Sequence, residues 1–543
     1  MKSSSRLLLL LSVILAVIIL DAFPFIQKEW ASFVLSKAAT RSTRSGISAI
    51  SSPLPSVTTS AMPNTITVSG QQWGKSTCFI GATEGSSRFD IADLEDLGIN
   101  TYHIYGGMSR WEAQDDSSVY GYPTISQIKA NPNAINWKQW DTVMTNPTGG
   151  SDYSWEPTPR WQGNARTLFS ELNAAHIRIV LTLRNRDDQH NPSWSPDPPR
   201  TTTDWNEWWE HVFATIYWLD VRNHYNVTDF EIHNEPDTPG QGWIPEATEG
   251  QYDMFAQYTD DAISYVFHTY LPGRSYHVYA PATSNSTWPK DMLHNIPQYF
   301  DSMDIHVYGD FRFGVEEVHA WMNQTAYAKE PLWVTEWGSY KYQYDSESFG
   351  ISLINDLIYG SSPGNDYVFG SNIFSLYDFS TNATGLINYK GGRRVDYYAM
   401  RLGIRALQGC RPTYQSITGN KDLLSITTTD AQKNVYLLVS NQSSKSPYTI
   451  HVNLSALLSR ASGIMWQFDS AHKDTIVGNP TLTNGMTSLS IPASGAVLVK
   501  FLYPFTLSSP AYEEPRSQRY LNEYCVKVHR KQGDRNAKRG QRV

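Results

Sequence analysis

Short apolar runs alternate with longer segments of helical periodicity along most of the chain. From about Ile66, eight runs are rich in β-branched and aromatic residues, which is typical of buried strands. Between several of these runs, as at 203–225 and 250–270, apolar residues recur at the spacing of an amphipathic helix. Eight such alternations predict an α/β fold, a (β/α)8 barrel. The predicted strands begin at Phe79, Ile99, Ile177, Val227, Ser275, Ser302, Pro331 and Ser371.

The pattern changes after about Arg405. Short strand-like runs follow, with turn residues between them and no strong helical segment. We therefore expect the barrel at residues 66–405 and a C-terminal β-sandwich at residues 406–508. The clearest of these strand-like runs begin at Val435, Tyr448, Gly463 and Gly495.

The N-terminal 22 residues carry the pattern of an export signal. Lys2 and Arg6 precede an apolar run from Leu7 to Leu20, which as a helix would span only ~21 Å. That length is short for a bilayer core of ~30 Å, so the run predicts a signal peptide. No clear small-residue cleavage site follows, and an uncleaved N-terminal anchor is the alternative. We expect a secreted or extracellular protein, or one anchored at the outer face of the membrane.

Two further segments show no hydrophobic period. Residues 23–65 are rich in Ser and Thr and predict a flexible linker. Residues 509–543 form a tail in which Lys and Arg outnumber the acids. Such composition is typical of a solvated, disordered tail, and electrostatic contact with an anionic surface is the alternative.

Composition and charge narrow the functional classes. The formal net charge of −8 shows no basic excess, so nucleic acid is not an expected partner. The 18 Trp and 32 Tyr residues indicate either a large core or a cleft with flat faces for sugar rings. Cys78, Cys410 and Cys525 are widely separated, so we expect no disulfide framework. No metal-ligand spacing or phosphate-binding glycine loop occurs, which predicts no metal and no cofactor.

Two glutamates stand where predicted barrel strands end, and function gathers at these ends. One strand ends at Asn234-Glu235-Pro236 and another at Thr335-Glu336-Trp337. Glycosidic hydrolysis needs one acid to protonate the leaving oxygen and a second carboxylate near the anomeric carbon. Carboxyls ~5 Å apart give retention of configuration, and ~6.5–9.5 Å gives inversion. Glu235 would have to hold its proton near neutrality, and Glu336 would have to stay ionised.

These motifs, with His306-x-Tyr308, resemble those of the clan A retaining glycoside hydrolases. The string "LGINTYHIYGG", the pair Asp115-Asp116, "EIHNEPD" and the trailing β-sandwich are most similar to family 39, which includes β-xylosidases and α-L-iduronidases. Family 5, with endo-glucanases and mannanases, is also similar. The resemblance implies that a strand near 66–73 joins the sandwich. It also implies roles for five residues: Glu235 as acid/base, Glu336 as nucleophile, Asn234 on the sugar 2-hydroxyl, Tyr308 as hydrogen-bond partner of the nucleophile, and His306 at the cleavage subsite.

The sequence departs from the clan at two positions. His103 stands where many members carry Arg, and it would be a weaker, pH-dependent donor. His233 stands where many relatives place Trp before the Asn-Glu pair. His103 and Tyr105 alternate along one strand, and we expect only one of them to face the barrel interior.

Further candidates have a second interpretation. His306 and Tyr308 either line the site or pack inside the barrel. Trp337 either stacks on a sugar or points to the other side of its strand. Tyr377 and Asp378 either floor the cleft or support a loop.

The leading hypothesis is a secreted retaining glycoside hydrolase acting on a plant, fungal or microbial polysaccharide or its oligosaccharides. One alternative is a non-catalytic carbohydrate-binding surface protein on a degenerate barrel, and another is a transglycosylase with the same two glutamates. The sugar, the linkage and endo or exo cleavage depend on loops such as 184–200 and 237–243.

Overall fold

The computed structural model describes the two predicted domains and leaves both ends of the chain aside. The signal or anchor segment, the linker to residue 63, Asp115-Asp116 and the basic tail lie outside the described residues. Within those residues, no helix is both long and apolar enough to cross a membrane. The described residues are 64–85, 89–111, 123–145, 164–184, 198–238, 248–284, 287–338, 345–362, 364–365, 367–378 and 384–503.

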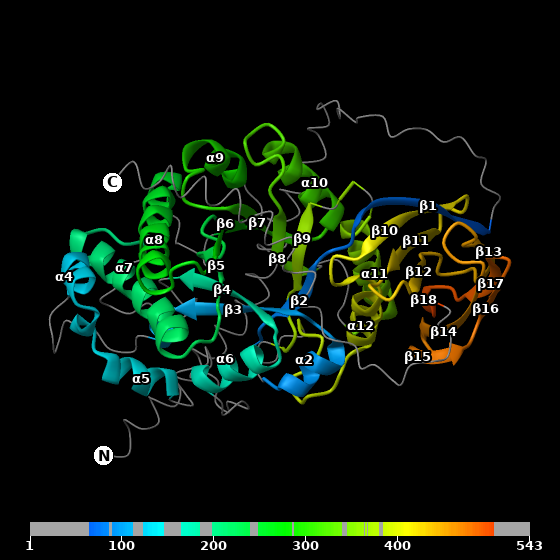
Figure 1. Cartoon of the computed structure of the whole chain (residues 1–543), viewed down its shortest axis with the longest axis horizontal. Helices are drawn as coiled ribbons and strands as arrows, with labels where there is room; N and C mark the ends of the chain where they lie inside the picture. The colour runs from blue at the N-terminus through cyan, green and yellow to red at the C-terminus, as the bar shows by residue number, and fades with distance from the viewer. Residues whose placement is uncertain are drawn as a thin grey trace, which may run out of the picture. The chain divides into compact units, whose positions relative to one another are not determined.

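Eight parallel strands close into a barrel in chain order, from β2 to β9 (Figure 1). Every strand expected from the apolar runs is present, so the predicted (β/α)8 architecture is confirmed. Because the strands are parallel, their C-terminal ends share one mouth of the barrel. Their bounds are β2 Phe79–Thr83, β3 Thr101–Gly107, β4 Arg178–Arg184, β5 Asp229–Ile232, β6 His277–Thr283, β7 Ser302–Tyr308, β8 Leu332–Gly338 and β9 Val368–Ile373.

Helices follow the strands and cover the outside of the barrel, as α5, α6, α7 and α8 do in Figure 1. The two longest predicted helices are α7, which continues as a π-helical segment, and α8. The Trp208 ring of α7 stacks on Phe255 of α8 with ring centroids 4.1 Å apart, so these two helices pack through aromatic side chains. The helices are α2 Ile91–Leu97, α3 Met108–Trp111, α4 Ile125–Ala130, η2 Pro132–Ala134, α5 Trp137–Thr145, α6 Ala165–Ala174, α7 Thr202–Ile216, η3 Tyr217–Arg222, α8 Glu249–Tyr270, α9 Trp288–Asn295, α10 Phe311–Met322, α11 Glu347–Gly360 and α12 Val395–Leu407.

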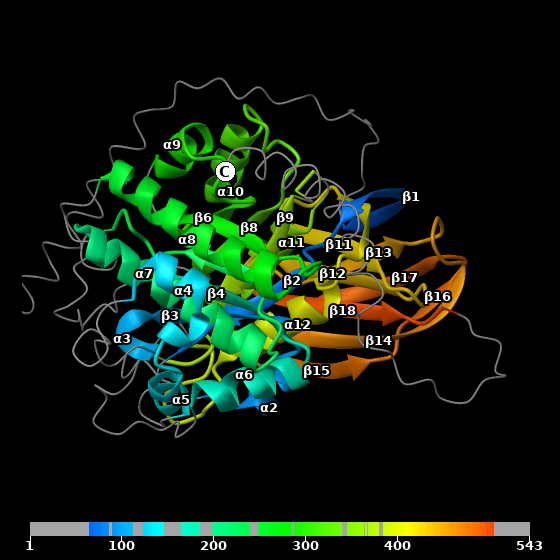
Figure 2. The ribbon, with the colours of Figure 1, turned by 60° about the vertical axis from the view of Figure 1, so that its left-hand side comes forward.

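The second domain is one ten-stranded sheet that curls until β14 also pairs with β18. Figure 2 shows β14, β17 and β18 along its length. Strand β1 pairs antiparallel with β10 and parallel with β13, so residues 65–75 belong to this sheet, as the family resemblance implied. The strands are β1 Thr65–Lys75, β10 Pro412–Thr418, β11 Leu423–Thr429, β12 Val435–Asn441, β13 Tyr448–Asn453, β14 Arg460–Phe468, β15 Lys473–Gly478, β16 Thr481–Thr483, β17 Met486–Ile491 and β18 Gly495–Phe501.

Helices α11 and α12 join the barrel to the second sheet. Asp474, the second residue of β15, accepts hydrogen bonds from Arg401 and Arg405 of α12 at 2.6 and 3.0 Å. On α11, a Cβ at Gly350 would lie 2.6 Å from the ring of Phe468. Only glycine therefore allows this close approach.

Cys78 and Cys410 form a disulfide, so the expectation that disulfides do not frame the fold is wrong. The two residues are 332 positions apart in sequence, but their Cα atoms lie 4.1 Å apart. Cys78 precedes β2 and Cys410 follows α12, and barrel closure brings these segments together. A backbone hydrogen bond beside the bridge, from Gly409 N to the carbonyl of Cys78 at 3.1 Å, also holds the two segments together. Sequence spacing could not reveal a pairing created by closure.

Candidate active site

Glu235 lies on a tightly turned segment just beyond β5. The strand ends at Ile232, and both His233 and Glu235 adopt positive φ angles, of 64° and 42°. Backbone bonds to both neighbouring strands hold this turn: His233 N donates to Leu183 O at 2.9 Å and Glu235 N to Ala282 O at 3.0 Å. Left-handed backbone at residues other than glycine is costly and is found at functional sites.

Glu336 is held inside the barrel by the register of two adjacent strands. His306 of β7 is the register partner of Glu336 in β8. Tyr308 follows His306 by two positions and therefore shares its face of the strand. Its hydroxyl donates to Glu336 Oε2 at 2.5 Å. The predicted contact between Tyr308 and Glu336 is therefore present.

The two glutamates and His306 meet at the mouth of the barrel. His306 Nδ1 lies 2.8 Å from Glu235 Oε1 and 3.3 Å from Glu336 Oε2. One side-chain oxygen of each glutamate and one nitrogen of His306 all lie within 4.8 Å of one another. All three side chains are buried. Residues from β7, from β8 and from the turn after β5, far apart in sequence, thus form one acidic cluster with an imidazole between the two carboxyls.

The charge of the glutamates decides the protonation of His306. Burial alone would lower the pKa of His306, but Glu336, Glu235 and Glu231 outweigh it and raise that pKa to about 10. At neutral pH, the bonded pair of His306 and Glu235 therefore holds a proton. A group that delivers a proton to a leaving oxygen needs such a store.

A second polar layer lies beneath this cluster. His103 is fully buried, with Nδ1 3.1 Å from Thr83 Oγ1 and Nε2 2.6 Å from Thr182 Oγ1. Burial lowers the pKa of His103 to about 4, so it is neutral at physiological pH. Its Nε2 lies 3.3 Å from Glu231, and burial raises the pKa of Glu231 and of its hydrogen-bonded partner Asp304. His103 thus belongs to the support of the site.

Tyr105 also faces the interior, which corrects the expectation that only one of His103 and Tyr105 would do so. Residues two apart on a strand share a face, and the two rings lie edge to face with centroids 5.0 Å apart. The Tyr105 hydroxyl donates to Glu336 Oε1. Tyr105 is therefore in the site itself.

Glu235, His306 and Glu336 are also, among the described residues, the one set of three ligand-type side chains close enough to surround a cation. Spacing in the sequence gave no sign of such a set. The Nδ1 atom of His306 is already hydrogen bonded to Glu235. Two carboxyls around one imidazole are an arrangement that suits proton transfer between the imidazole and a carboxyl.

Comparison with known proteins gives one family match and many structural neighbours. Residues 232–359, which include both glutamates and His306, match the family model described as glycosyl hydrolase catalytic core. This segment of the chain is therefore similar to a glycosyl hydrolase catalytic core. No curated protein sequence matches the chain.

Three solved structures share the fold of this chain at low sequence identity. A GH30 endoxylanase from Clostridium papyrosolvens C71 is 14% identical with a TM-score of 0.57, covering 81% of this chain and 100% of its own. A glucosidase from Croceicoccus marinus is 11% identical, with a TM-score of 0.59 and coverages of 82% and 100%. A GH39 enzyme from Xanthomonas axonopodis pv. citri is 14% identical with a TM-score of 0.57, covering 83% of this chain and 99% of its own. The resemblance to clan A, with family 39 among its members, is confirmed.

The structure does not bring every candidate residue to the glutamates. Trp337 is buried against Phe311 of α10, with ring centroids 5.4 Å apart, so its ring lies on the helix side of β8. The Tyr377 hydroxyl bonds the backbone of Asp90 at the start of α2. Asp378 forms an ion pair with Arg394. These three side chains support the frame around the site.

Three residues next to the acid pair differ in whether their polar atoms have hydrogen-bond partners. Asn234 is buried, and its Oδ1 has no hydrogen-bond partner within the described part of the chain. His306 Nε2 is in the same situation. Buried polar atoms are normally paired, so both are available to a substrate hydroxyl. The ring of His233 instead packs edge to face against Phe255 of α8.

Sequence reasoning missed Arg184. It ends β4 and is buried, with its guanidinium carbon 4.6 Å from the centre of the Tyr105 ring. Its position at a strand end was a usable signal. Of the loops expected to set specificity, residues 185–197 and 239–247 lie outside the described residues.

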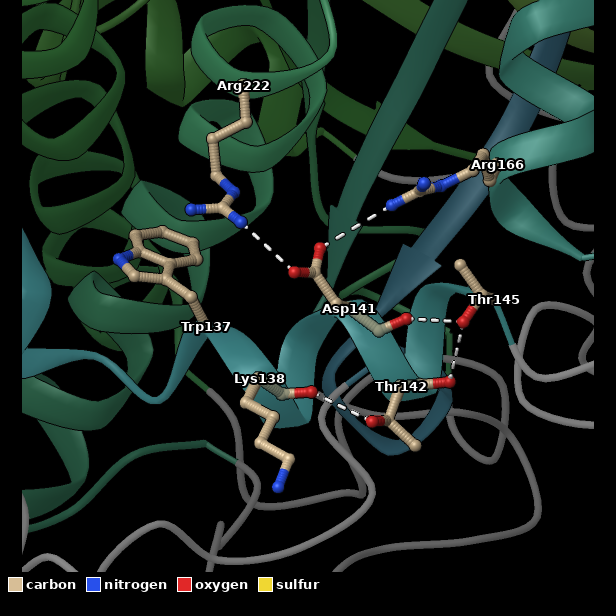
Figure 3. Close-up of a pocket in the computed structure, with 7 residues that line it drawn as sticks. All are labelled: Trp137, Lys138, Asp141, Thr142, Thr145, Arg166 and Arg222. Atoms are coloured by element: carbon tan, nitrogen blue, oxygen red, sulfur yellow. Dashed lines mark hydrogen bonds and ion pairs between the residues drawn. The ribbon is translucent and has the colours of Figure 1, made fainter.

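A separate surface hollow of about 620 Å³ lies against α5, α6 and η3 (Figure 3). Asp141 at its centre binds Arg222 at 3.0 Å and Arg166 at 3.5 Å. Trp137 stacks on Tyr217 and lies under Arg222. The central charges are matched internally and the aromatic faces are covered, so this hollow lacks the features of a sugar site. The residues that line it are Trp137, Lys138, Asp141, Thr142, Thr145, Arg166 and Arg222.

Proposed function

We propose that this glycosidase cleaves poly- or oligosaccharides with retention of configuration by double displacement. Glu336 attacks the anomeric carbon while Glu235 protonates the leaving oxygen, which breaks the glycosidic bond and forms a glycosyl ester. Glu235 then removes a proton from a water molecule, whose oxygen displaces Glu336 from the sugar.

The observation that carries this proposal is the spacing of the two carboxyls. An oxygen of Glu235 and an oxygen of Glu336 lie within 4.8 Å, which fits the ~5 Å of retaining enzymes and leaves too little room for the water of an inverting one. The same spacing speaks against a degenerate, non-catalytic barrel, because both carboxyls have the separation that catalysis needs.

The surrounding residues support the division of roles. His306 contacts both glutamates and provides a proton store beside Glu235. Two tyrosyl hydroxyls donate to Glu336, and these bonds hold its carboxyl in one orientation for attack on the sugar. We assign the Asn234 amide, adjacent to Glu235, to a hydroxyl of the bound sugar.

The structural neighbours indicate which substrates to test first. They include an endoxylanase and a glucosidase, so xylosides and glucosides are the first sugars to test. We also propose that the protein is secreted or held at the outer face of the membrane. The N-terminal apolar run supports export, and the Cys78–Cys410 disulfide suits an oxidising compartment.

The test uses Glu235→Gln and Glu336→Gln with a panel of aryl glycosides and polysaccharides. Each variant should lose at least about 10³-fold in turnover, since each removes a group required in both half-reactions, and each should keep its circular dichroism spectrum. Proton NMR of the first-formed sugar should show the substrate's anomeric configuration. Activity retained in either variant, or an inverted product, would overturn the mechanism.

Azide separates the two roles. With an activated glycoside, azide should restore turnover to a truncated Glu235→Ala variant and give a glycosyl azide of retained configuration. With Glu336→Ala it should give the inverted azide. Analysis of products at high acceptor concentration distinguishes hydrolysis from transglycosylation, and fractionation of an expressing culture tests export.

A further inference from the structure

Glu336 is bound by a tyrosyl hydroxyl on each of its two oxygens. Tyr308 donates to Oε2 and Tyr105 donates to Oε1. Tyr308 comes from β7, next to the nucleophile strand, and Tyr105 comes from β3 on another part of the barrel wall. Neither donor carries a formal charge, and His103 on β3 is neutral as well.

Arg184 places a formal positive charge over the face of Tyr105. Its guanidinium carbon lies 4.6 Å from the Tyr105 ring centre, and β3 and β4 are paired so that Gly107 faces Arg184. A cation over an aromatic face attracts its electrons, which makes the phenolic hydrogen a stronger donor. Burial and Glu336 raise the pKa of Tyr105, while Arg184 acts in the opposite direction.

The Tyr105 ring is fixed from the backbone side. Its N–H donates to Glu84 Oε1 at 2.8 Å. At the next residue, a Cβ on Gly106 would lie 2.8 Å from the ring of Trp111. The strand end is therefore closely packed, and the hydroxyl can be aimed at one oxygen of Glu336.

We propose that Tyr105 stabilises Glu336 as the departing carboxylate in the second half-reaction, and that Arg184 is a positioning residue acting through the Tyr105 ring. This inference rests on the proposed retaining mechanism. Glu336 loses negative charge as it attacks and regains that charge as the glycosyl ester breaks. A donor that binds the charged carboxylate best therefore assists the second step more than the first.

The first experiment compares Tyr105→Phe with the wild-type enzyme on 2,4-dinitrophenyl β-D-xyloside and the corresponding glucoside. Because this leaving group makes the first step fast, kcat reports the second step. Loss of a hydrogen bond to a charged group should lower kcat ~10- to 100-fold. KM should fall in parallel, kcat/KM should change much less, and stopped flow should show a burst of dinitrophenolate as the glycosyl-enzyme accumulates.

A purely structural role predicts a different result. It would lower kcat and kcat/KM together, without a burst, and that outcome would overturn the proposal, as would unchanged kinetics. Tyr102→Phe is the matched control: Tyr102 lies on the same strand with its ring 6.1 Å from Phe89, and its replacement should leave kcat and the burst unchanged.

The second experiment is a double-mutant cycle. Arg184→Met should lower kcat and produce a burst in the wild-type background but have little further effect when Tyr105 is Phe, because its action passes through that ring. Additive losses would overturn the role of Arg184. If Tyr105→Phe does not fold, Arg184→Met must still show the burst for the proposal to stand. Glu336→Gln in the same assays distinguishes failure of the retaining mechanism from failure of the role of Tyr105. If Glu336→Gln keeps its activity, the mechanism itself is wrong. If Glu336→Gln is inactive and Tyr105→Phe has wild-type kinetics, only the role of Tyr105 is wrong.

Discussion

The two ends of the barrel use charged residues in opposite ways. At the end where the strands begin, Asp229 binds Arg178 through two hydrogen bonds, at 2.5 and 2.7 Å, and accepts a third from Tyr279. The Arg178 guanidinium also lies 4.5 Å from the ring centre of Phe79. At the other end, Asn234 and His306 each keep a polar atom without a partner within the described residues.

The pKa values show the same difference. Burial would raise the pKa of Asp229, but Arg178, His277 and Tyr279 outweigh it and lower that pKa. Burial dominates at Asp304, in the layer beneath the glutamates, and raises its pKa well above the usual range. A buried acid with a complete set of partners stabilises a fold, and a buried acid with a like-charged neighbour provides chemistry.

The largest effect on stability is expected at Asp229, at the end of the barrel where the strands begin. Asp229→Ala leaves the part-buried guanidinium of Arg178 without its buried partner and should cost about 3 kcal/mol in the free energy of unfolding, measured by urea denaturation. The paired variant Arg178→Met with Asp229→Leu should recover part of this loss. A loss below about 1 kcal/mol for Asp229→Ala would show that the two ends do not differ in this way.

Removal of the disulfide should rank next. Cys78→Ser with Cys410→Ser should lower the free energy of unfolding by about 2–5 kcal/mol, because the bridge restricts a long loop in the unfolded chain. The kcat of the folded variant should equal that of the wild type. A large loss of kcat at full folding would mean that the two ends are coupled.

His306 should make stability depend on pH in the alkaline range. Its pKa in the folded state, about 10, exceeds the ordinary 6.5, so its contribution is complete below pH 6.5 and is lost as the pH rises through about 10. Over this pH interval, the melting temperature of the wild type should fall more steeply than that of His306→Gln. Parallel curves for the two proteins would contradict a charged His306.

The smallest effect is expected at Tyr377. Tyr377→Phe removes the hydrogen bonds to Asp90 and should cost about 1 kcal/mol of stability, read from a urea midpoint. Since the hydroxyl lies at the start of α2, kcat/KM should stay within about twofold of wild type. A tenfold fall in kcat/KM would return Tyr377 to the substrate-binding residues.

Much of the fold and the centre of the site could be predicted because they follow local rules. The eight apolar runs identify the barrel strands, and parallel strands bring their ends to one mouth. That rule brought Glu235 and Glu336 together, and the resemblance to clan A implied that His306 and Tyr308 lie beside them. The error over His103 and Tyr105 was also local, since residues two apart must share a face.

The sequence by itself thus determined the barrel, the second β domain and the acid pair, because periodicity and strand-end motifs are properties of neighbouring residues. Only the tertiary structure decided which distant side chains meet: Tyr105 with Glu336, Arg184 with Tyr105, and Cys78 with Cys410. It also decided that Trp337 packs on Phe311, away from the glutamates. These contacts depend on how the barrel closes and on the register between strands, and neither quantity is encoded in a short stretch of chain.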